Sequence, residues 1–165
     1  MSKVTSQKTL AIIPARYASS RFPGKPLVKI AGKSMIQHVW ERAMQTQAVD
    51  EVLVATDDQR ILNAVEKFGG KAVLTSTEHK TGTDRIVEAL SGHSCDWVLN
   101  IQGDEPLVLP SDLERLIRKA QHTEGTKAAT LIFKITDEAK LHDPNVVKVT
   151  LNQKVKGGES IIAEI

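Results

Sequence analysis

The sequence contains little cysteine and no long apolar segment, and each of these absences excludes a class of protein. Cys95 is the only cysteine, so the chain cannot form an internal disulfide framework or a multi-cysteine metal site. We expect a buried or half-buried thiol at this position. No apolar run reaches the length of a membrane span, and the N-terminal run is too short for a signal peptide and meets Arg16 at once. We therefore expect a cytoplasmic protein with no membrane partner.

The sequence also lacks a strong excess of either charge. The formal net charge is +2, and the apolar fraction of 41% and charged fraction of 25% are ordinary for a soluble globular protein. A basic cluster in this chain is thus a local feature, and we expect no nucleic-acid partner. The length of 165 residues favours a single domain over residues 1–165.

Two standard phosphate-binding loops are missing. The GxxxxGK[ST] pattern is absent because Lys25 is followed by Pro26, which argues against a P-loop ATPase or GTPase. No GxGxxG pattern follows the first apolar strand, which argues against a dinucleotide-dependent dehydrogenase. The five histidines show no metal-ligand spacing.

Apolar strands alternate with amphipathic helices along most of the chain. Residues 9–14 are continuously apolar, as expected of a parallel strand covered on both faces. Further strands are predicted at 51–56, 71–75, 96–102, 127–135 and 145–151, and helices at 34–46, 58–68, 83–90 and 111–121. This alternation predicts an α/β, Rossmann-like fold: an open, mostly parallel sheet with helices on both faces.

The loop after the first strand carries Arg16, Arg21 and Lys25 and no acidic residue. Open parallel sheets bind ligands beyond the carboxyl ends of their strands, where the strand order reverses. The loop after the strand at 96–102 carries Asp104, so cations and a carboxylate face each other if the two strands are neighbours. Such a crevice fits a nucleoside triphosphate with magnesium, because cations bind phosphate oxygens and a carboxylate holds a metal that keeps most of its waters.

Several motifs strengthen this interpretation. PARYASSRFPGKPL, ATDD, HKTGTDR, NIQGDEP and DPNVVKV follow one another in this order, and in this combination the chain resembles the 3-deoxy-manno-octulosonate (KDO) cytidylyltransferases from about residue 10 to residue 149. The resemblance implies a nucleotide-diphospho-sugar transferase-like fold and the transfer of CMP from CTP to KDO. Pyrophosphate would be released, and the product would enter lipopolysaccharide biosynthesis. The first motif alone would also fit sialic-acid cytidylyltransferases, but NIQGDEP together with TGTDR favours the KDO branch.

The resemblance also implies roles for individual residues. Arg16, Lys25 and Asp104 would be catalytic, and Asp104 would bind Mg²⁺ as the cofactor. The implied nucleotide-binding set consists of Ala15, Arg16, Arg21, Lys25, Thr81, Thr83, Arg85 and Gln102. Simpler roles remain open from the residues alone: Asp104 is a common turn former before proline, and Thr81 or Thr83 can cap the helix that follows.

Members of the family continue beyond the DPNVVKV segment into parts that supply most of the sugar-acid pocket, the dimer contact and a second metal carboxylate. We do not find these motifs here, so we expect the nucleotide-binding part of the enzyme, with weak CTP binding and no production of CMP-KDO by this chain alone. A homodimer is expected only for the full-length enzyme. Two alternatives stay open: a CTP-binding fragment without catalysis, and a cytidylyltransferase for another sugar acid such as sialic acid.

Overall fold

The computed structural model describes residues 7–18, 22–132, 134–149 and 161–164. The chain divides into two units, Met1–Glu114 and Arg115–Ile165. Within the described ranges, no helix has the length and apolar character that a membrane crossing requires. The candidate site lies entirely in the first unit, as shown below.

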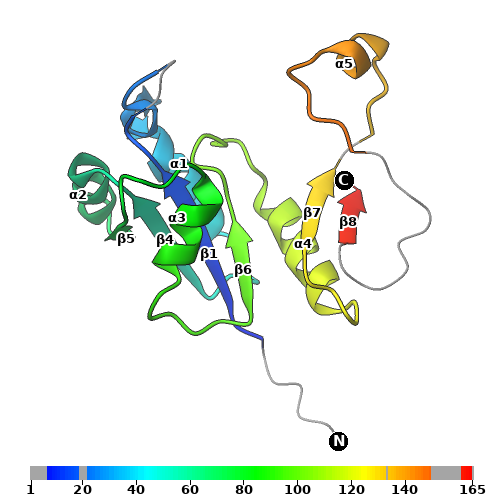
Figure 1. Ribbon diagram of the computed structural model, residues 1–165, viewed down its shortest axis with the longest axis horizontal. Helices are drawn as coiled ribbons and strands as arrows, with labels where there is room; N and C mark the ends of the chain where they lie inside the picture. The colour runs from blue at the N-terminus through cyan, green and yellow to red at the C-terminus, as the bar shows by residue number, and fades with distance from the viewer. Residues whose placement is uncertain (1–6, 19–21, 133, 150–160, 165) are drawn as a thin grey trace, which may run out of the picture. The chain divides into compact units, whose positions relative to one another are not determined.

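A parallel sheet of four strands forms the centre of the first unit (Figure 1). Its strands are β1 (Thr9–Ala15), β4 (Glu51–Thr56), β5 (Lys71–Leu74) and β6 (Trp97–Asn100), in the order β5-β4-β1-β6. β1 pairs with β4 on one side and with β6 on the other, and all pairs are parallel. The strand order therefore reverses beside β1, between β1 and β6. This confirms the predicted neighbours and places the candidate site at their carboxyl ends.

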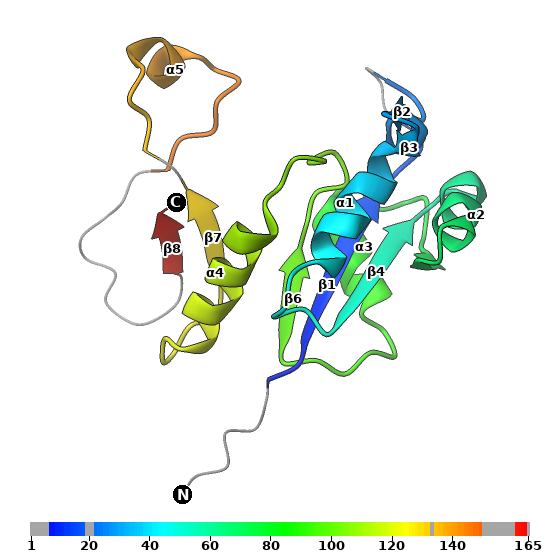
Figure 2. The same ribbon diagram turned by 180° about the vertical axis from the view of Figure 1, so that it is seen from behind.

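Helices cover both faces of this sheet, as predicted. They are α1 (Met35–Met44), α2 (Gln59–Lys67) and α3 (Gly82–Ala89), while α4 (Pro110–Gln121) runs across the boundary of the two units. Figures 1 and 2 show α1 and α3 on opposite faces of the sheet. α1 buries Ile36, Val39 and Ala43, three members of one helical stripe.

The core on the α3 side of the sheet consists of alternate residues of two strands and one face of the helix. It contains Leu10 and Ile12 of β1, Leu53 and Ala55 of β4, and Ile86 and Ala89 of α3. Cys95 is half-buried and packs against this cluster, as expected from the sequence. The core thus fixes α3, whose first residues reach the candidate site.

A small hairpin follows the basic loop and was not predicted. β2 (Lys29–Ile30) and β3 (Lys33–Ser34) pair antiparallel. They are joined by Ala31 and Gly32, both with positive φ (48° and 84°), the conformation that a two-residue hairpin turn of type I′ requires. The hairpin leads directly into α1 and so ends the basic loop.

The second unit contains β7 (Ala129–Ile132), α5 (Glu138–His142) and β8 (Ile161–Glu164), and β7 pairs parallel with β8. β7 lies inside the strand predicted at 127–135, but α5 and β8 were not predicted. The strand predicted at 145–151 is wrong for residues 145–149, which form a turn and irregular chain, while 150 and 151 lie outside the described residues. Asp143 explains the difference, because its carboxylate accepts hydrogen bonds from both the backbone and side-chain nitrogen of Asn145 and stabilises a turn.

Candidate functional site

The ends of β1 and β6 meet closely because of a glycine. A Cβ atom on Gly103 would lie 2.9 Å from the carbonyl oxygen of Pro14, so a residue with a side chain would push the two segments apart. The chain after β6 also stays bonded to β1, since the backbone nitrogen of Ile101 donates to the oxygen of Ile12 at 3.1 Å. Gln102 and Asp104, which flank Gly103, are thereby brought to the carboxyl end of β1.

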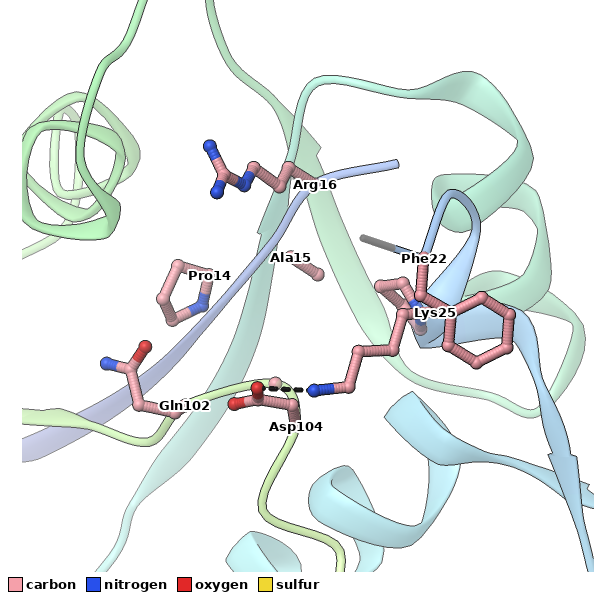
Figure 3. A pocket seen from close by; sticks show the side chains of 9 residues that line it. Pro14, Ala15, Arg16, Phe22, Lys25, Gln102 and Asp104 are labelled. Carbon is pink, nitrogen blue, oxygen red and sulfur yellow. Dashed lines mark hydrogen bonds and ion pairs between the residues drawn. The ribbon is translucent and has the colours of Figure 1, made fainter. Parts of the chain in front are cut away.

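A cavity of about 650 Å³ opens at this meeting point (Figure 3). The residues that line it are Pro14, Ala15, Arg16, Phe22, Lys25, Pro26, Gln102, Gly103 and Asp104. Of these, Ala15, Arg16, Lys25, Gln102 and Asp104 were predicted as site residues. The cavity thus combines two cations from the loop after β1 with one carboxylate from the loop after β6.

Lys25 and Asp104 form an ion pair across the cavity. The Nζ atom of Lys25 lies 2.6 Å from Oδ2 of Asp104, and the two side chains are 38% and 53% exposed. Figure 3 shows this contact as a dashed line, with the guanidinium of Arg16 pointing away from it. The sequence predicted that both groups face a ligand, and the structure shows that they also bind each other. An exposed pair of this kind contributes about 1 kcal/mol at most, so a ligand of higher charge can replace it.

Glu105, the next residue, is a second carboxyl group near the cavity. Partial burial of this group raises the pKa of Glu105, and repulsion from the neighbouring Asp104 carboxylate raises it further. Its negative form is therefore less favoured than that of an ordinary glutamate, and a cation placed between the two carboxylates would relieve the repulsion.

A second cavity of about 190 Å³ lies between the end of β1 and the start of α3. Its lining consists of Pro14, Ala15, Arg16, His79, Lys80, Thr81, Gly82, Arg85 and Gln102. Pro14, Ala15, Arg16 and Gln102 line both cavities. A ligand can therefore contact Arg16 and Gln102 from either cavity.

Thr81 is the residue that caps α3, which decides between the two predicted threonines. Its hydroxyl accepts from the backbone nitrogen of Asp84 at 3.1 Å, and the Asp84 carboxylate accepts from the backbone nitrogen of Thr81 at 3.1 Å. The pKa of Asp84 is lowered, chiefly by the hydrogen bond from the Thr81 side chain. Thr83 is described but is not among the residues that line these two cavities.

Arg85 forms a wall of the second cavity, yet its guanidinium binds other parts of the protein. The side chain is 4% exposed, and Nη2 donates to Oδ2 of Asp57 at 2.7 Å. Nη1 donates to the hydroxyl of Thr75 and, at 3.4 Å, to the carbonyl of Ser76. These bonds tie α3 to the carboxyl ends of β4 and β5. Asp57 is thus used by Arg85, and Asp58 alone caps α2 by accepting from the nitrogen of Arg60.

The remaining predicted residues are Gln102 and Arg21. The amide nitrogen of Gln102 donates to Oδ1 of Asn100 at 2.9 Å, which holds the side chain at the end of β6. Arg21 lies outside the described residues. Within the described ranges no group of three or more histidine, cysteine, aspartate or glutamate side chains could hold a metal ion.

Several lining residues were missed by the sequence reasoning. Phe22 and Pro26 belong to the motif around the three cations, but nothing in their residue type pointed to a cavity wall. Lys80 directly precedes the cap of α3, so a cation beside a helix start was a signal that could have found it. His79 also lines the second cavity, and it pairs with Glu88 of α3.

Comparisons with known proteins show the family of this chain. A model of the cytidylyltransferase family matches residues 10–159. The chain is 48% identical to the 3-deoxy-manno-octulosonate cytidylyltransferase of Escherichia coli over 89% of its own length and 59% of that protein. It is 52% identical to the 8-amino-3,8-dideoxy-manno-octulosonate cytidylyltransferase of Shewanella pealeana (strain ATCC 700345 / ANG-SQ1), over 86% of this chain and 59% of the relative.

A solved structure gives the same result. The structure of a CMP:2-keto-3-deoxy-manno-octonic acid synthetase complexed with CTP superposes with a TM-score of 0.85 at 49% identity, covering 88% of this chain and 60% of the other. The chain therefore spans about 59% to 60% of the length of the proteins it matches.

Proposed function

The chain belongs to the cytidylyltransferase family, and we propose that it supplies the nucleotide-binding part of an enzyme that transfers CMP from CTP to 3-deoxy-manno-octulosonate. The observation that carries this proposal is the cavity at the switch point of the sheet. Arg16 and Lys25 come to it from one strand end and Asp104 from the next. Its similarity to a synthetase complexed with CTP supports CTP as the nucleotide.

The reaction proposed is a nucleotidyl transfer. The oxygen of the sugar acid's anomeric hydroxyl attacks the α-phosphorus of CTP and loses its proton to solvent. The bond from that phosphorus to the bridging oxygen breaks, and pyrophosphate leaves with the electron pair. Arg16 and Lys25 would bind phosphate oxygens, Arg16 by planar paired donors and Lys25 as a compact charge. The catalytic contribution of these residues would be positioning and neutralisation of the negative charge that grows on the leaving group.

Magnesium is proposed as the cofactor, with Asp104 as its ligand. Mg²⁺ binds through one or two carboxylates together with substrate phosphates and keeps several waters. A single exposed carboxylate beside two cations fits a metal that arrives with the triphosphate, and fits a preformed cage of protein ligands poorly. When bound, the ion would neutralise phosphate charge and polarise the phosphoryl group. Asp104 would have to give up its contact with Lys25, which would then be free to bind a phosphate oxygen.

The second cavity is proposed to hold the base and ribose. The start of α3 supplies backbone N–H groups, which favour acceptor atoms, and Thr81, Arg85 and Gln102 lie around it. The amide of Gln102 has donors and acceptors that match a base edge. Because the two cavities share Arg16 and Gln102, one nucleotide can extend from one into the other.

A second sugar acid has a specific observation in its favour. A relative at 52% identity is named for 8-amino-3,8-dideoxy-manno-octulosonate, and this identity lies between the 48% and 54% of two relatives named for KDO. The two sugars share the carboxylate and the reacting end and differ at position 8. We propose KDO as the substrate and lipopolysaccharide biosynthesis in the cytoplasm as the setting, where CTP is available.

Two measurements on the chain test this proposal together. Isothermal titration with CTP and Mg²⁺, with ATP as the comparison nucleotide, reports binding, and pyrophosphate release with KDO or its 8-amino analogue reports transfer. For the nucleotide-binding part alone, we expect CTP binding without pyrophosphate release. Release that depends on KDO would mean that the groups that bind the sugar acid lie within these residues, and no preference for CTP over ATP would contradict the proposed nucleotide.

A further inference from the structure

Tyr17 occupies a central place in the loop that carries the cations. The backbone nitrogen of Gly24 donates to the carbonyl oxygen of Tyr17 at 2.9 Å. Arg16 directly precedes Tyr17, and Lys25 directly follows Gly24. One hydrogen bond therefore joins the two positions next to the cations, which are nine residues apart in the sequence and line the same cavity.

The Tyr17 ring also packs against this junction. Gly24 has a φ of 73°, and a Cβ atom there would lie 3.1 Å from Cε2, Cζ and Oη of the Tyr17 side chain. The left-handed conformation and the close tyrosine both favour glycine at this position. The next turn starts from the same residue, because the nitrogen of Leu27 donates to the oxygen of Gly24 at 2.8 Å. The ring thus limits where Lys25 can lie.

Arg60, near the start of α2, covers the ring from another element. Its guanidinium carbon lies 3.3 Å from the ring centroid of Tyr17, the geometry of a cation–π contact. Arg60 is itself fixed by Asp58, the cap of the same helix, through contacts of 2.8 Å and 2.7 Å to the two carboxylate oxygens. The helix start therefore presents a planar group in a defined orientation to the tyrosine.

The backbone of Tyr17 is held by the neighbouring carboxylate. Its nitrogen donates to Oδ1 of Asp57 in a long hydrogen bond of 3.4 Å, and Oδ2 of Asp57 is held by the buried Arg85. The ATDD motif thus contacts the cation loop through both of its aspartates, one directly and the other through Arg60. The sequence alone does not show that the ATDD motif contacts the loop that carries Arg16 and Lys25.

We propose that Tyr17 is a positioning residue for the triphosphate, and that Arg60 acts through it. Tyr17 fixes the spacing of Arg16 and Lys25, so both cations can reach the same polyphosphate. Because the loop is already ordered, binding does not have to offset the loss of its conformational entropy. This inference rests on the proposed function, because the cations are assigned to nucleotide phosphates. It predicts a loss of affinity that grows with the number of phosphates on the ligand.

The test compares CTP with CMP on the complete chain. We measure both dissociation constants by isothermal titration in Mg²⁺ for the wild type, Tyr17→Ala, Tyr17→Phe and Arg60→Ala, together with each melting temperature. Arg42→Ala is the matched control, since Arg42 lies on α1 and lines neither cavity. A protein that is only less stable would lose affinity for both nucleotides alike, so the ratio of the two constants isolates positioning.

For Tyr17→Ala we expect CTP affinity to fall on the order of tenfold and CMP affinity by less than about twofold, because misplaced binding groups lose much of their contribution. Tyr17→Phe keeps the aromatic ring, so its ratio of CTP to CMP dissociation constants should stay close to that of the wild type. Arg60→Ala should shift it by about two- to fivefold, the value of an exposed cation–π contact. Arg42→Ala should leave it unchanged.

An unchanged ratio in both Tyr17→Ala and Arg60→Ala would overturn the inference and leave the proposed function standing. If Tyr17→Ala does not fold, Arg60→Ala decides, since its side chain is exposed and its removal spares the core. A wild type that binds neither nucleotide would overturn the proposed function, and the positioning role would fall with it.

Discussion

Replacing Lys25 with alanine should separate the binding of the triphosphate from the stability of the fold. The Lys25 side chain is 38% exposed, and its ion pair with Asp104 joins two residues that line the larger cavity. Removing an exposed pair costs about 1 kcal/mol at most. We therefore expect the variant to fold and to melt within a few degrees of the wild type.

The loss of CTP affinity follows from two opposing contributions. A hydrogen bond from a charged donor to a phosphate contributes about 1.5 to 3 kcal/mol. The wild type must first break the Lys25–Asp104 contact, which costs up to about 1 kcal/mol, and the variant avoids this cost. With the full cost subtracted, the net loss is about 0.5 to 2 kcal/mol, which corresponds to roughly 2- to 30-fold in the dissociation constant.

The assay is isothermal titration of Lys25→Ala with CTP and with CMP in Mg²⁺. Lys29→Ala is the control, because Lys29 is an exposed lysine of the same loop region that lines neither cavity. CTP binding should weaken in Lys25→Ala only, and CMP binding should change little. An equal loss of affinity for CTP and CMP in Lys25→Ala would refute the assignment of Lys25 to the β- and γ-phosphates. The same loss of CTP affinity in Lys29→Ala would refute it as well.

Three further predictions concern the neighbouring carboxylates and the buried ion pair. Asp104→Asn should abolish the Mg²⁺ dependence of CTP affinity while urea unfolding stays unchanged; an affinity that still rises with Mg²⁺ would place the metal elsewhere. Arg85→Ala leaves the Asp57 carboxylate, 13% exposed, without its buried partner and should lower the free energy of unfolding by about 3 to 5 kcal/mol, measured in urea with Arg42→Ala alongside. The pKa of Glu105 is higher in the folded state than its ordinary value of 4.5, so the folded state binds this proton more tightly than the unfolded state. Deprotonation of Glu105 therefore lowers the free energy of unfolding as the pH rises above about 4.5. Glu105→Gln should therefore be more stable than the wild type at pH 7 and lose this advantage at pH 4, and equal stabilities at pH 7 would contradict the direction of the shift.

The sequence predicted the sheet well because its strands and helices carry clear patterns. β1 and β4 are buried apolar runs, and Asp58 and Thr81 are helix caps of an ordinary kind. The predictions were weaker where local chemistry competes with pattern. The helix predicted at 34–46 spans Met35–Met44, and the Ser34 hydroxyl makes no cap bond to it. α4 begins at Pro110, one residue before the helix predicted at 111–121.

The sequence pointed to several polar residues that line the cavities, but it did not show the contacts between them. Lys25 and Asp104 are 79 residues apart, and charge alone placed them at one edge of the sheet. That they bind each other depends on the close approach at Gly103, which only the backbone path reveals. Arg85 lines the second cavity, and the sequence could not show that its donors bind Asp57, Thr75 and Ser76. A buried pairing between two motifs cannot be read from either motif alone.

The central claim is that CTP binds at the carboxyl ends of β1 and β6. A titration of the ¹⁵N-labelled chain with CTP and Mg²⁺, followed by NMR, tests it most directly. The account predicts saturable shifts at the backbone amides of Ala15, Arg16, Lys25, Gln102 and Asp104, which lie around the two cavities. It predicts none at Glu51 and Lys71, which form an ion pair at the amino ends of β4 and β5, away from the carboxyl ends of the strands. Saturable shifts at Glu51 and Lys71 with none around the cavities would contradict it.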